Sequence, residues 1–173
     1  LRLPDGEIGE LAARGPVVTR GYDARPEADE AAKIAGEGGA VWHRMGDLGW
    51  RDGEGRLWFC GRKSQRVVTP KGTLYTIPCE AVFNEHPKVR RTALVGLGPE
   101  ELRVPALCVE LEKGHKPSEA LKRELLALGA AREHTRGIKT VLFHPAFPVD
   151  IRHNAKIFRE KLAVWAQREC LGL

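Results

Sequence analysis

The sequence predicts an α+β fold in two parts, a β-rich part over residues 1–62 and a small mixed α/β domain over residues 63–173. Up to Gly61-Arg62, short apolar stretches alternate with turns rich in Gly, Pro and Asp, which is typical of antiparallel strands. After Arg62, strand-like stretches are mixed with stretches that carry apolar residues at helical spacing. About 110 residues of such a mixture form a small domain.

Turn residues divide the first part into short elements. Residues 7–13 and 16–18 are predicted strands, and they follow a turn in which Gly6 occupies the position of positive φ. Residues 25–39 are rich in Glu, Ala and Gly, so we expect a short helix at the start of this stretch and a loop at its end. A hairpin then follows, with residues 52–55 as the turn between strands at 47–50 and 56–59.

The second part combines strands with capped helices. Pro78 suits the first position of a helix over residues 78–85, with Glu80 in its first turn. Ser118 and Glu119 cap a helix whose leucines form a stripe that packs in the core. The remaining predictions are strands at 65–69 and 73–76 around a turn at 70–72, strands at 89–96, 106–111 and 139–143, and a last helix with Lys156 at its mouth.

Composition excludes several classes of protein. The net charge is +5, but the basic residues are spread along the chain and not clustered with aromatic residues, so we expect no nucleic-acid partner. The charge is equally compatible with attraction to anionic small molecules such as nucleotides. The four cysteines form no CxxC and the six histidines lack zinc-ligand spacing, so we expect no metal site. The scattered cysteines indicate buried or idle thiols of a protein in a reducing cytoplasm. No apolar run reaches about 18 residues, so we expect no membrane span. The chain starts in mid-pattern at Leu1, which suggests a fragment.

Three polar residues are candidates for a site. The carboxylate of Asp47 has several lone-pair positions and can accept hydrogen bonds from two ribose hydroxyls. Arg62 can support the same sugar or a phosphate, and Lys156 offers a mobile point charge for a phosphate or carboxylate oxygen. Each has a plainer interpretation: Asp47 as a turn or cap residue, and Arg62 and Lys156 as solvated surface cations.

The order of these signals resembles the C-terminal third of the adenylate-forming superfamily, which includes acyl-CoA synthetases, peptide-synthetase adenylation domains and firefly luciferase. The resemblance covers nearly the whole chain: GEIGELAARGPVVTRGY, then WHRMGDLGWRDGEGRLWFCGR with its GD and GR motifs, then Pro78-Cys79-Glu80. Two motifs depart from the family pattern. Ser64 stands at the hinge position, where Asp or Lys is usual, and Asn154-Ala155-Lys156 replaces Ser/Thr-Gly-Lys.

The resemblance implies a role for each candidate residue. Asp47 and Arg62 would bind the ribose of ATP, Ser64 would be the hinge, and Lys156 would be the lysine that swings in for adenylation. It also implies a partial β-barrel subdomain over residues 1–62 and a mobile lid over residues 63–173. The phosphate loop, the acyl pocket and the Mg²⁺ ligand would lie in a large domain upstream, so this piece alone would be inactive.

The segments FPVDIRHNAKIFREKL and VVTPKGTLYTIPCEAVFNEHP look most similar to one branch, the β-lactone synthetases of bacterial olefin biosynthesis. That branch implies conversion of a 2-alkyl-3-hydroxy fatty acid into a β-lactone, AMP and pyrophosphate, with other enzymes of olefin biosynthesis as partners. A fatty acyl-CoA or aryl-CoA ligase shares every motif named, and a non-catalytic binding module with the lid fold is a further alternative.

Three further residues have both a functional and a plain interpretation. Lys71 and Gly72 would face the acyl or pantetheine channel, or they form a simple hairpin turn. His153 would contact the acyl carbonyl or hydroxyl, or it is a solvated loop histidine.

Overall fold

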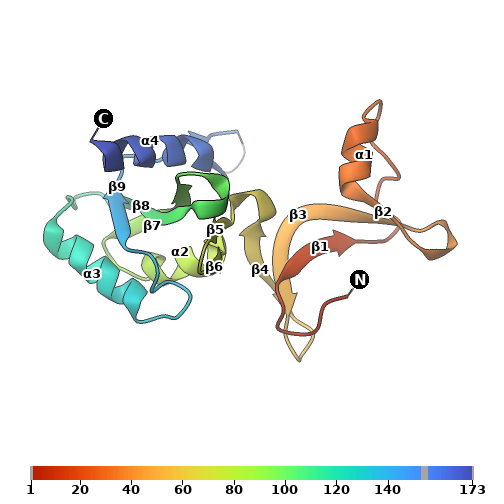
Figure 1. Cartoon of the computed structure of the whole chain (residues 1–173), viewed down its shortest axis with the longest axis horizontal. Helices are drawn as coiled ribbons and strands as arrows, with labels where there is room; N and C mark the ends of the chain where they lie inside the picture. Colours follow the sequence, from red (N-terminus) through yellow and green to blue (C-terminus); the bar gives the residue numbers. More distant parts are fainter. Residues whose placement is uncertain (1, 153–155, 173) are drawn as a thin grey trace. The chain divides into compact units, whose positions relative to one another are not determined.

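The computed structural model describes residues 2–152 and 156–172, and the chain divides into two units, Leu1–Ser64 and Gln65–Leu173. The first unit is mainly antiparallel sheet, and the second mixes strands with three longer helices (Figure 1). The predicted mixture of helices and strands is therefore confirmed.

The first unit is built on one long strand, β3 (Val41–Arg51). Three shorter strands pair antiparallel with it: β1 (Gly9–Ala13), β2 (Lys33–Ala35) and β4 (Leu57–Arg62). β2 pairs with the first residues of β3, and β4 pairs with its last residues. The predicted strand pair around residues 52–55 is confirmed, and β3 begins six residues earlier than the prediction at residue 47.

Asp52 fixes the turn between β3 and β4. Its Oδ1 accepts hydrogen bonds from the amides of Glu54 and Arg56 at 3.0 and 2.9 Å. Its Oδ2 accepts from Arg56 Nε at 2.7 Å and from the indole of Trp58 at 2.8 Å. The hydrogen bonds from Trp58 and Arg56 stabilise the ionised carboxylate, so they lower the pKa of Asp52.

The connection from β1 to β3 differs from the prediction in two places. Residues 16–18 are not a strand, because Val18 N donates to Gly15 O at 3.1 Å and closes a turn around Pro16, which has no N–H for a ladder. The short helix is confirmed as α1 (Pro26–Ala32). β2 follows it directly, where we expected loop, and a 3₁₀ turn, η1 (Glu37–Gly39), leads into β3.

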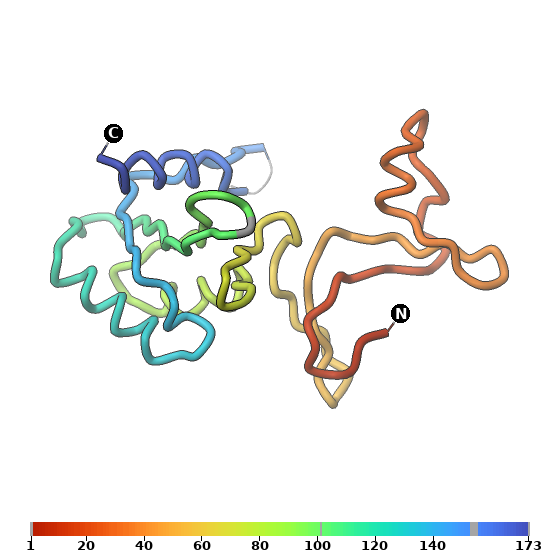
Figure 2. Tube along the Cα trace, viewed as in Figure 1, coloured from red at the N-terminus to blue at the C-terminus, as the bar shows by residue number. Residues whose placement is uncertain are grey.

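The second unit is organised on a three-stranded sheet of β7 (Val89–Leu97), β8 (Val104–Leu111) and β9 (Thr140–Phe143). β7 and β8 are antiparallel and are joined through the 3₁₀ turn η3 (Glu100–Leu102). β9 is parallel to β8, and Figure 2 shows the chain crossing between them through α3 (Glu119–Ala130). Parallel neighbours require such a crossover connection.

Helices cover both faces of this sheet. Leu94, Leu107 and Val109 pack on one face with α2 (Thr76–Asn84) and α3. Their strand neighbours point to the other face and pack with α4 (Arg159–Leu171); they are Ala93, Val95, Ala106 and Cys108. The alternation follows from the period of two along a strand, and it gives the unit an apolar core on each side of the sheet.

The helix starts test the predicted caps. The cap of α3 is confirmed, since Ser118 Oγ accepts from Leu121 N at 3.1 Å. α2 begins at Thr76, two residues before Pro78, and its first turn tolerates proline because the first N–H groups of a helix have no intrahelical partner. Glu80 therefore lies beyond the first turn, contrary to the prediction, and its side chain is buried.

Two short hairpins complete the second unit. β5 (Val67–Thr69) and β6 (Gly72–Leu74) follow the 3₁₀ turn η2 (Lys63–Gln65) and confirm the predicted hairpin there. β10 (Val149–Asp150) pairs with β11 (Lys156–Ile157) before α4. Lys156 is thus in a strand and not at the mouth of the helix, because Phe158, with ψ 81°, separates β11 from α4.

Within residues 2–152 and 156–172, no helix is long and apolar enough to cross a membrane.

Candidate functional site

Asp47 and Arg62 lie opposite each other in the β3–β4 ladder. Arg62 Nη1 is 3.2 Å from Asp47 Oδ1, and the same nitrogen donates a hydrogen bond to Met45 O at 3.0 Å. The Asp47 side chain is 17% exposed and the Arg62 side chain 52% exposed. The fold of the first unit therefore brings together a sheltered carboxylate and a guanidinium that reaches solvent.

The backbone around this pair is irregular. Gly46, with φ +67°, directly precedes Asp47, and Gly61, with φ +112°, directly precedes Arg62. The register also shifts between Leu48 and Gly49, so that Cys60 is an extra residue on β4. Bulges of this kind bend a strand and redirect the side chains next to it, which is how the sequence places Asp47 and Arg62 at the end of the ladder.

The carboxylate of Asp47 keeps acceptor capacity. Its Oδ1 is buried and accepts no hydrogen bond from the described residues, because the contact with Arg62 has the distance of an ion pair but lacks hydrogen-bond geometry. Buried polar atoms nearly always have a partner, so an open acceptor calls for an explanation. A donor from a ligand, such as a sugar hydroxyl, would satisfy this oxygen.

An ion-pair group holds the end of the first unit against β1. Glu10 Oε2 accepts from Arg44 Nε at 3.0 Å and from Lys63 Nζ at 2.8 Å. Burial raises the pKa of Glu10, but the hydrogen bonds from both cations outweigh it and leave the pKa lowered. Ser64 follows Lys63 directly; it is exposed, lies in η2 and is the last residue of the first unit.

Lys156 belongs to the second unit, where it pairs with Asp150 in the β10–β11 ladder. Its side chain is exposed, and no other described residue is paired with its ammonium. Asp150 Oδ1 instead accepts from Arg152 N at 3.0 Å. Lys156 thus presents an exposed cation on a short hairpin.

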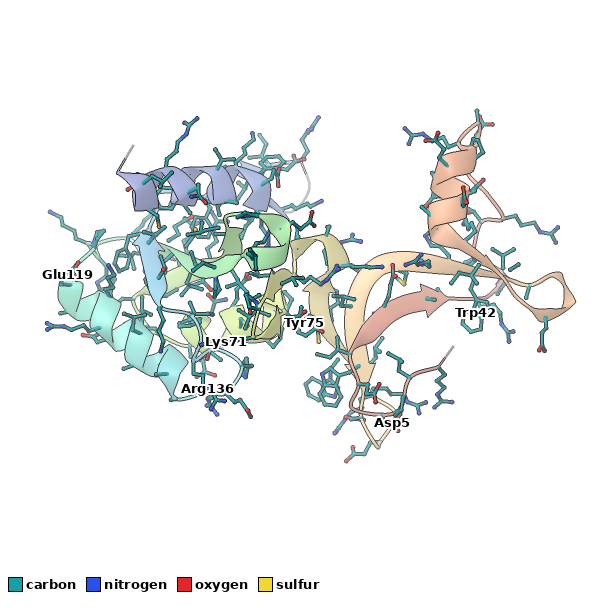
Figure 3. All side chains as sticks on the ribbon, in the orientation of Figure 1. Asp5, Trp42, Lys71, Tyr75, Glu119 and Arg136 are labelled. Carbon is teal, nitrogen blue, oxygen red and sulfur yellow. The ribbon has the colours of Figure 1, made fainter. Side chains whose placement is uncertain are left out.

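The remaining candidates are dispersed. Lys71, which is labelled in Figure 3, lies at the exposed tip of the β5–β6 hairpin. Its amide donates to Thr69 Oγ1 at 3.2 Å. Gly72, with φ +128°, follows it and closes the same hairpin. The prediction for His153 falls outside the described residues. In the part of the chain that the structure describes, no group of three or more metal-ligating side chains gathers.

The sequence analysis did not identify Arg159, which follows Lys156 by three residues and forms an ion pair with a buried glutamate. Arg159 Nη2 donates to the buried carboxylate of Glu80 at 2.8 Å. One signal was available in the sequence: Glu80 interrupts an apolar helix face formed by Cys79, Val82 and Phe83, and a buried charge at such a position needs a cation.

Similarity to known proteins covers almost all of the chain. An olefin β-lactone synthetase from Stenotrophomonas maltophilia is 56% identical over 171 residues, which is 96% of this chain and 31% of that protein. A 2-succinylbenzoate–CoA ligase from Geobacillus kaustophilus is 36% identical over 68% of this chain and 23% of its own length. The chain therefore spans about a third or less of the length of these relatives. No protein-family model matches it.

Solved structures agree with this similarity. An ATP-bound RpMatB–BxBclM chimera superposes with a TM-score of 0.80 at 26% identity, over 95% of this chain and 32% of that one. The chain belongs to the adenylate-forming superfamily, and the relatives named above are a synthetase and a ligase. Within it, the 56% identity relates the chain to an olefin β-lactone synthetase more strongly than to the CoA ligase.

Proposed function

We propose that this chain is the C-terminal portion of an AMP-forming, acid-activating enzyme that makes a β-lactone. The carboxylate of a 2-alkyl-3-hydroxy fatty acid attacks the α-phosphorus of ATP, and pyrophosphate leaves. The 3-hydroxyl oxygen then attacks the carbonyl carbon of the acyl adenylate, loses its proton and expels AMP. Because the nucleophile is already tethered to the acyl group, proximity replaces a second substrate. The identity to an olefin β-lactone synthetase is the observation that carries this proposal.

In this proposal each candidate residue has a distinct task. Asp47 accepts hydrogen bonds from the ribose hydroxyls, which would satisfy its open Oδ1, and Arg62 supports the same sugar. Lys156 places its ammonium where negative charge gathers as the carboxylate attacks the phosphate. Lys71, Gly72 and His153 would contribute acyl-site contacts, and the substrates would be ATP and a fatty acid.

We further propose that the two units differ in role. Residues 1–62 would be the end of a large domain with a partial β-barrel, and residues 63–173 a lid that moves about Ser64. A lid can deliver a catalytic group only when the substrate is bound, and such movements are common in enzymes. The described residues contain no group of three or more side chains that could hold a metal ion. In this proposal the Mg²⁺ ligands belong to the large domain.

A fatty acyl-CoA or aryl-CoA ligase is the second candidate, favoured by the 36% identity to 2-succinylbenzoate–CoA ligase. It shares the adenylation step and differs only in the nucleophile of the second step. The full-length protein with ATP, Mg²⁺ and a 2-alkyl-3-hydroxy fatty acid separates the two. Mass spectrometry should find AMP and a β-lactone without CoA. A thioester formed only when CoA is added would replace the proposal with the ligase.

Two variants of the full-length protein test the residue roles. Lys156→Ala should lower the rate of ATP–pyrophosphate exchange by about 100-fold or more and leave nucleotide binding largely intact. Asp47→Ala should raise the KM for ATP, since a ribose contact is lost. Lys116→Ala, another exposed lysine of the second unit, is the control and should behave as wild type. Exchange at the wild-type rate in Lys156→Ala would remove Lys156 from adenylation.

A further inference from the structure

Two glutamates of the second unit are buried: Glu80 on α2, 6% exposed, and Glu110 on β8, 2% exposed. The proposed function uses neither of them. A buried carboxylate is unfavourable unless cations and hydrogen-bond donors surround it. The partners of each glutamate therefore identify what its burial holds in place.

Glu80 holds the start of α4. Arg159, the first residue of that helix, donates from Nη1 and Nη2 to the two oxygens of Glu80 at 2.5 and 2.8 Å. Leu94 N, on β7, donates to Glu80 Oε1 at 2.7 Å. Burial raises the pKa of Glu80, and the hydrogen bonds from Arg159 oppose this shift. A bidentate contact fixes the orientation of the arginine as well as its distance from the carboxylate. The first residue of α4 is therefore held at a defined position against α2 and β7.

Glu110 holds the chain before the β10–β11 hairpin. Its Oε2 accepts from Phe147 N at 2.7 Å and from Arg91 Nε at 2.9 Å, and its Oε1 accepts from Arg90 Nη1 at 2.9 Å. The ring of Phe147 is buried, with its centroid 5.4 Å from the Arg91 guanidinium carbon. Phe147 is therefore attached to the sheet by a hydrogen bond to the Glu110 carboxylate, whose negative charge Arg90 and Arg91 compensate.

Lys156 lies between these two attachments. The stem of the hairpin is closed by the β10–β11 ladder and by Phe158 N, which donates to Pro148 O at 2.9 Å. Phe147 and Arg159 are thus each attached to a buried carboxylate, and Val149 and Ile157, between them in sequence, pack against the apolar core. Lys156 lies close in sequence to the second attachment, so movement at Arg159 would be passed directly to it.

We propose that Glu80 and Glu110 are positioning residues for Lys156, because they hold both ends of the stretch that carries it. This inference rests on the proposed role of Lys156 in adenylation. Neither glutamate would touch the reacting atoms. A displacement of about 1 Å can cost about 100-fold in rate, so loss of either attachment should slow adenylation. Recognition of ATP by Asp47 and Arg62, in the first unit, should be unchanged.

The test uses the full-length protein with Glu80→Gln and Glu110→Gln, which keep the side-chain size and remove the charge. The kcat of ATP–pyrophosphate exchange should fall by about 100-fold, with the KM for ATP within about twofold of wild type. Glu112→Gln is the matched control, because this glutamate is exposed and follows β8 directly. It should keep wild-type kcat and KM.

Hydrogen exchange gives a readout that does not depend on activity. Phe158 N and Leu162 N donate to Pro148 O and Phe158 O, so their protection reports how firmly the hairpin stem and the start of α4 are held. In Glu80→Gln, exchange should rise in a peptide covering residues 147–162. A peptide covering α3 should keep its protection, which separates a local effect from general loss of structure.

The outcomes distinguish this inference from the proposed function. If Lys156→Ala loses exchange activity while both glutamine variants keep wild-type kcat and protection, the positioning role is wrong and the proposed function stands. If Lys156→Ala is active, the function assigned to Lys156 is wrong. Should Glu80→Gln fail to fold, Arg159→Lys decides, since lysine keeps the charge without the fork: a lower kcat at unchanged KM supports positioning, and a wild-type kcat overturns it.

Discussion

The two units differ in what holds them together. Among the described residues, the buried apolar side chains belong almost entirely to the second unit, and the first unit contributes only Leu48 and Cys60. The first unit relies on ion pairs and turn hydrogen bonds, such as those of Glu10 and Asp52. Polar contacts that are exposed or only partly buried contribute little each, whereas apolar burial is the main driving force of folding. The two units should therefore differ widely in stability.

Exposed aromatic residues sharpen this contrast. Trp58 and Phe59 on β4 and Met45 on β3 are about half exposed, and Trp42 on β3 is 37% exposed. Trp50 and Trp58 stack across the β3–β4 ladder with their ring centroids 5.8 Å apart, which supports the hairpin but forms no closed core. The sheet of the first unit consequently presents apolar surface of the kind that other parts of a protein usually cover.

The largest expected effect comes from producing the units separately. Residues 65–173 should fold alone, because their sheet is covered on both faces. Residues 1–64 should remain largely unfolded, since so small a chain with hardly any core lacks the burial that folding requires. Circular dichroism during thermal unfolding gives the measurement. A cooperative transition in the 1–64 fragment would remove the contrast between the units.

A matched pair of substitutions has the next largest effect. Leu107→Ala on β8 opens a cavity at a fully buried position and should lower the free energy of unfolding of the second unit by about 2–5 kcal/mol. Leu57→Ala on β4 removes the same atoms from an exposed position and should change stability by about 0.5 kcal/mol or less. Urea titrations of both variants measure the difference, and equal losses would contradict this account of the cores.

Local chemistry explains what the sequence predicts well. Turn and cap residues act over a few positions, so Asp52 and Ser118 correctly located a hairpin and a helix start. Asp47 and Arg62 were both identified from short motifs, and their cross-strand pairing adds the geometry. Their roles in nucleotide binding, like that of Lys156, stay predictions.

Contacts between distant residues explain what the sequence did not predict. Glu80 and Arg159 are 79 positions apart, and no local pattern states that they pair. β2 has its strand conformation only because β3 lies beside it, since its own three residues carry a weak signal. The same limit applies to Lys156, whose placement in β11 depends on pairing with β10 and not on the helix that follows.

The smallest expected effect requires no substitution. Cys60 is buried in the first unit, and Cys79 and Cys108 are buried in the second, where burial raises the pKa of each thiol to about 12. Alkylation needs a thiolate that reagent can reach, so these residues react only when their surroundings open. Burial raises the pKa of Cys60 as well, but its unit should open more readily.

We therefore expect iodoacetamide at pH 8 to label the exposed Cys170 first and Cys60 next, with Cys79 and Cys108 slowest. A difference of about tenfold between Cys60 and the two core thiols would correspond to about 1.4 kcal/mol in opening free energy. Mass spectrometry of peptides after timed labelling measures each rate, and Cys170 serves as the internal reference for reagent. If Cys60 were as slow as Cys108, the polar contacts of the first unit would hold it as firmly as the apolar cores hold the second.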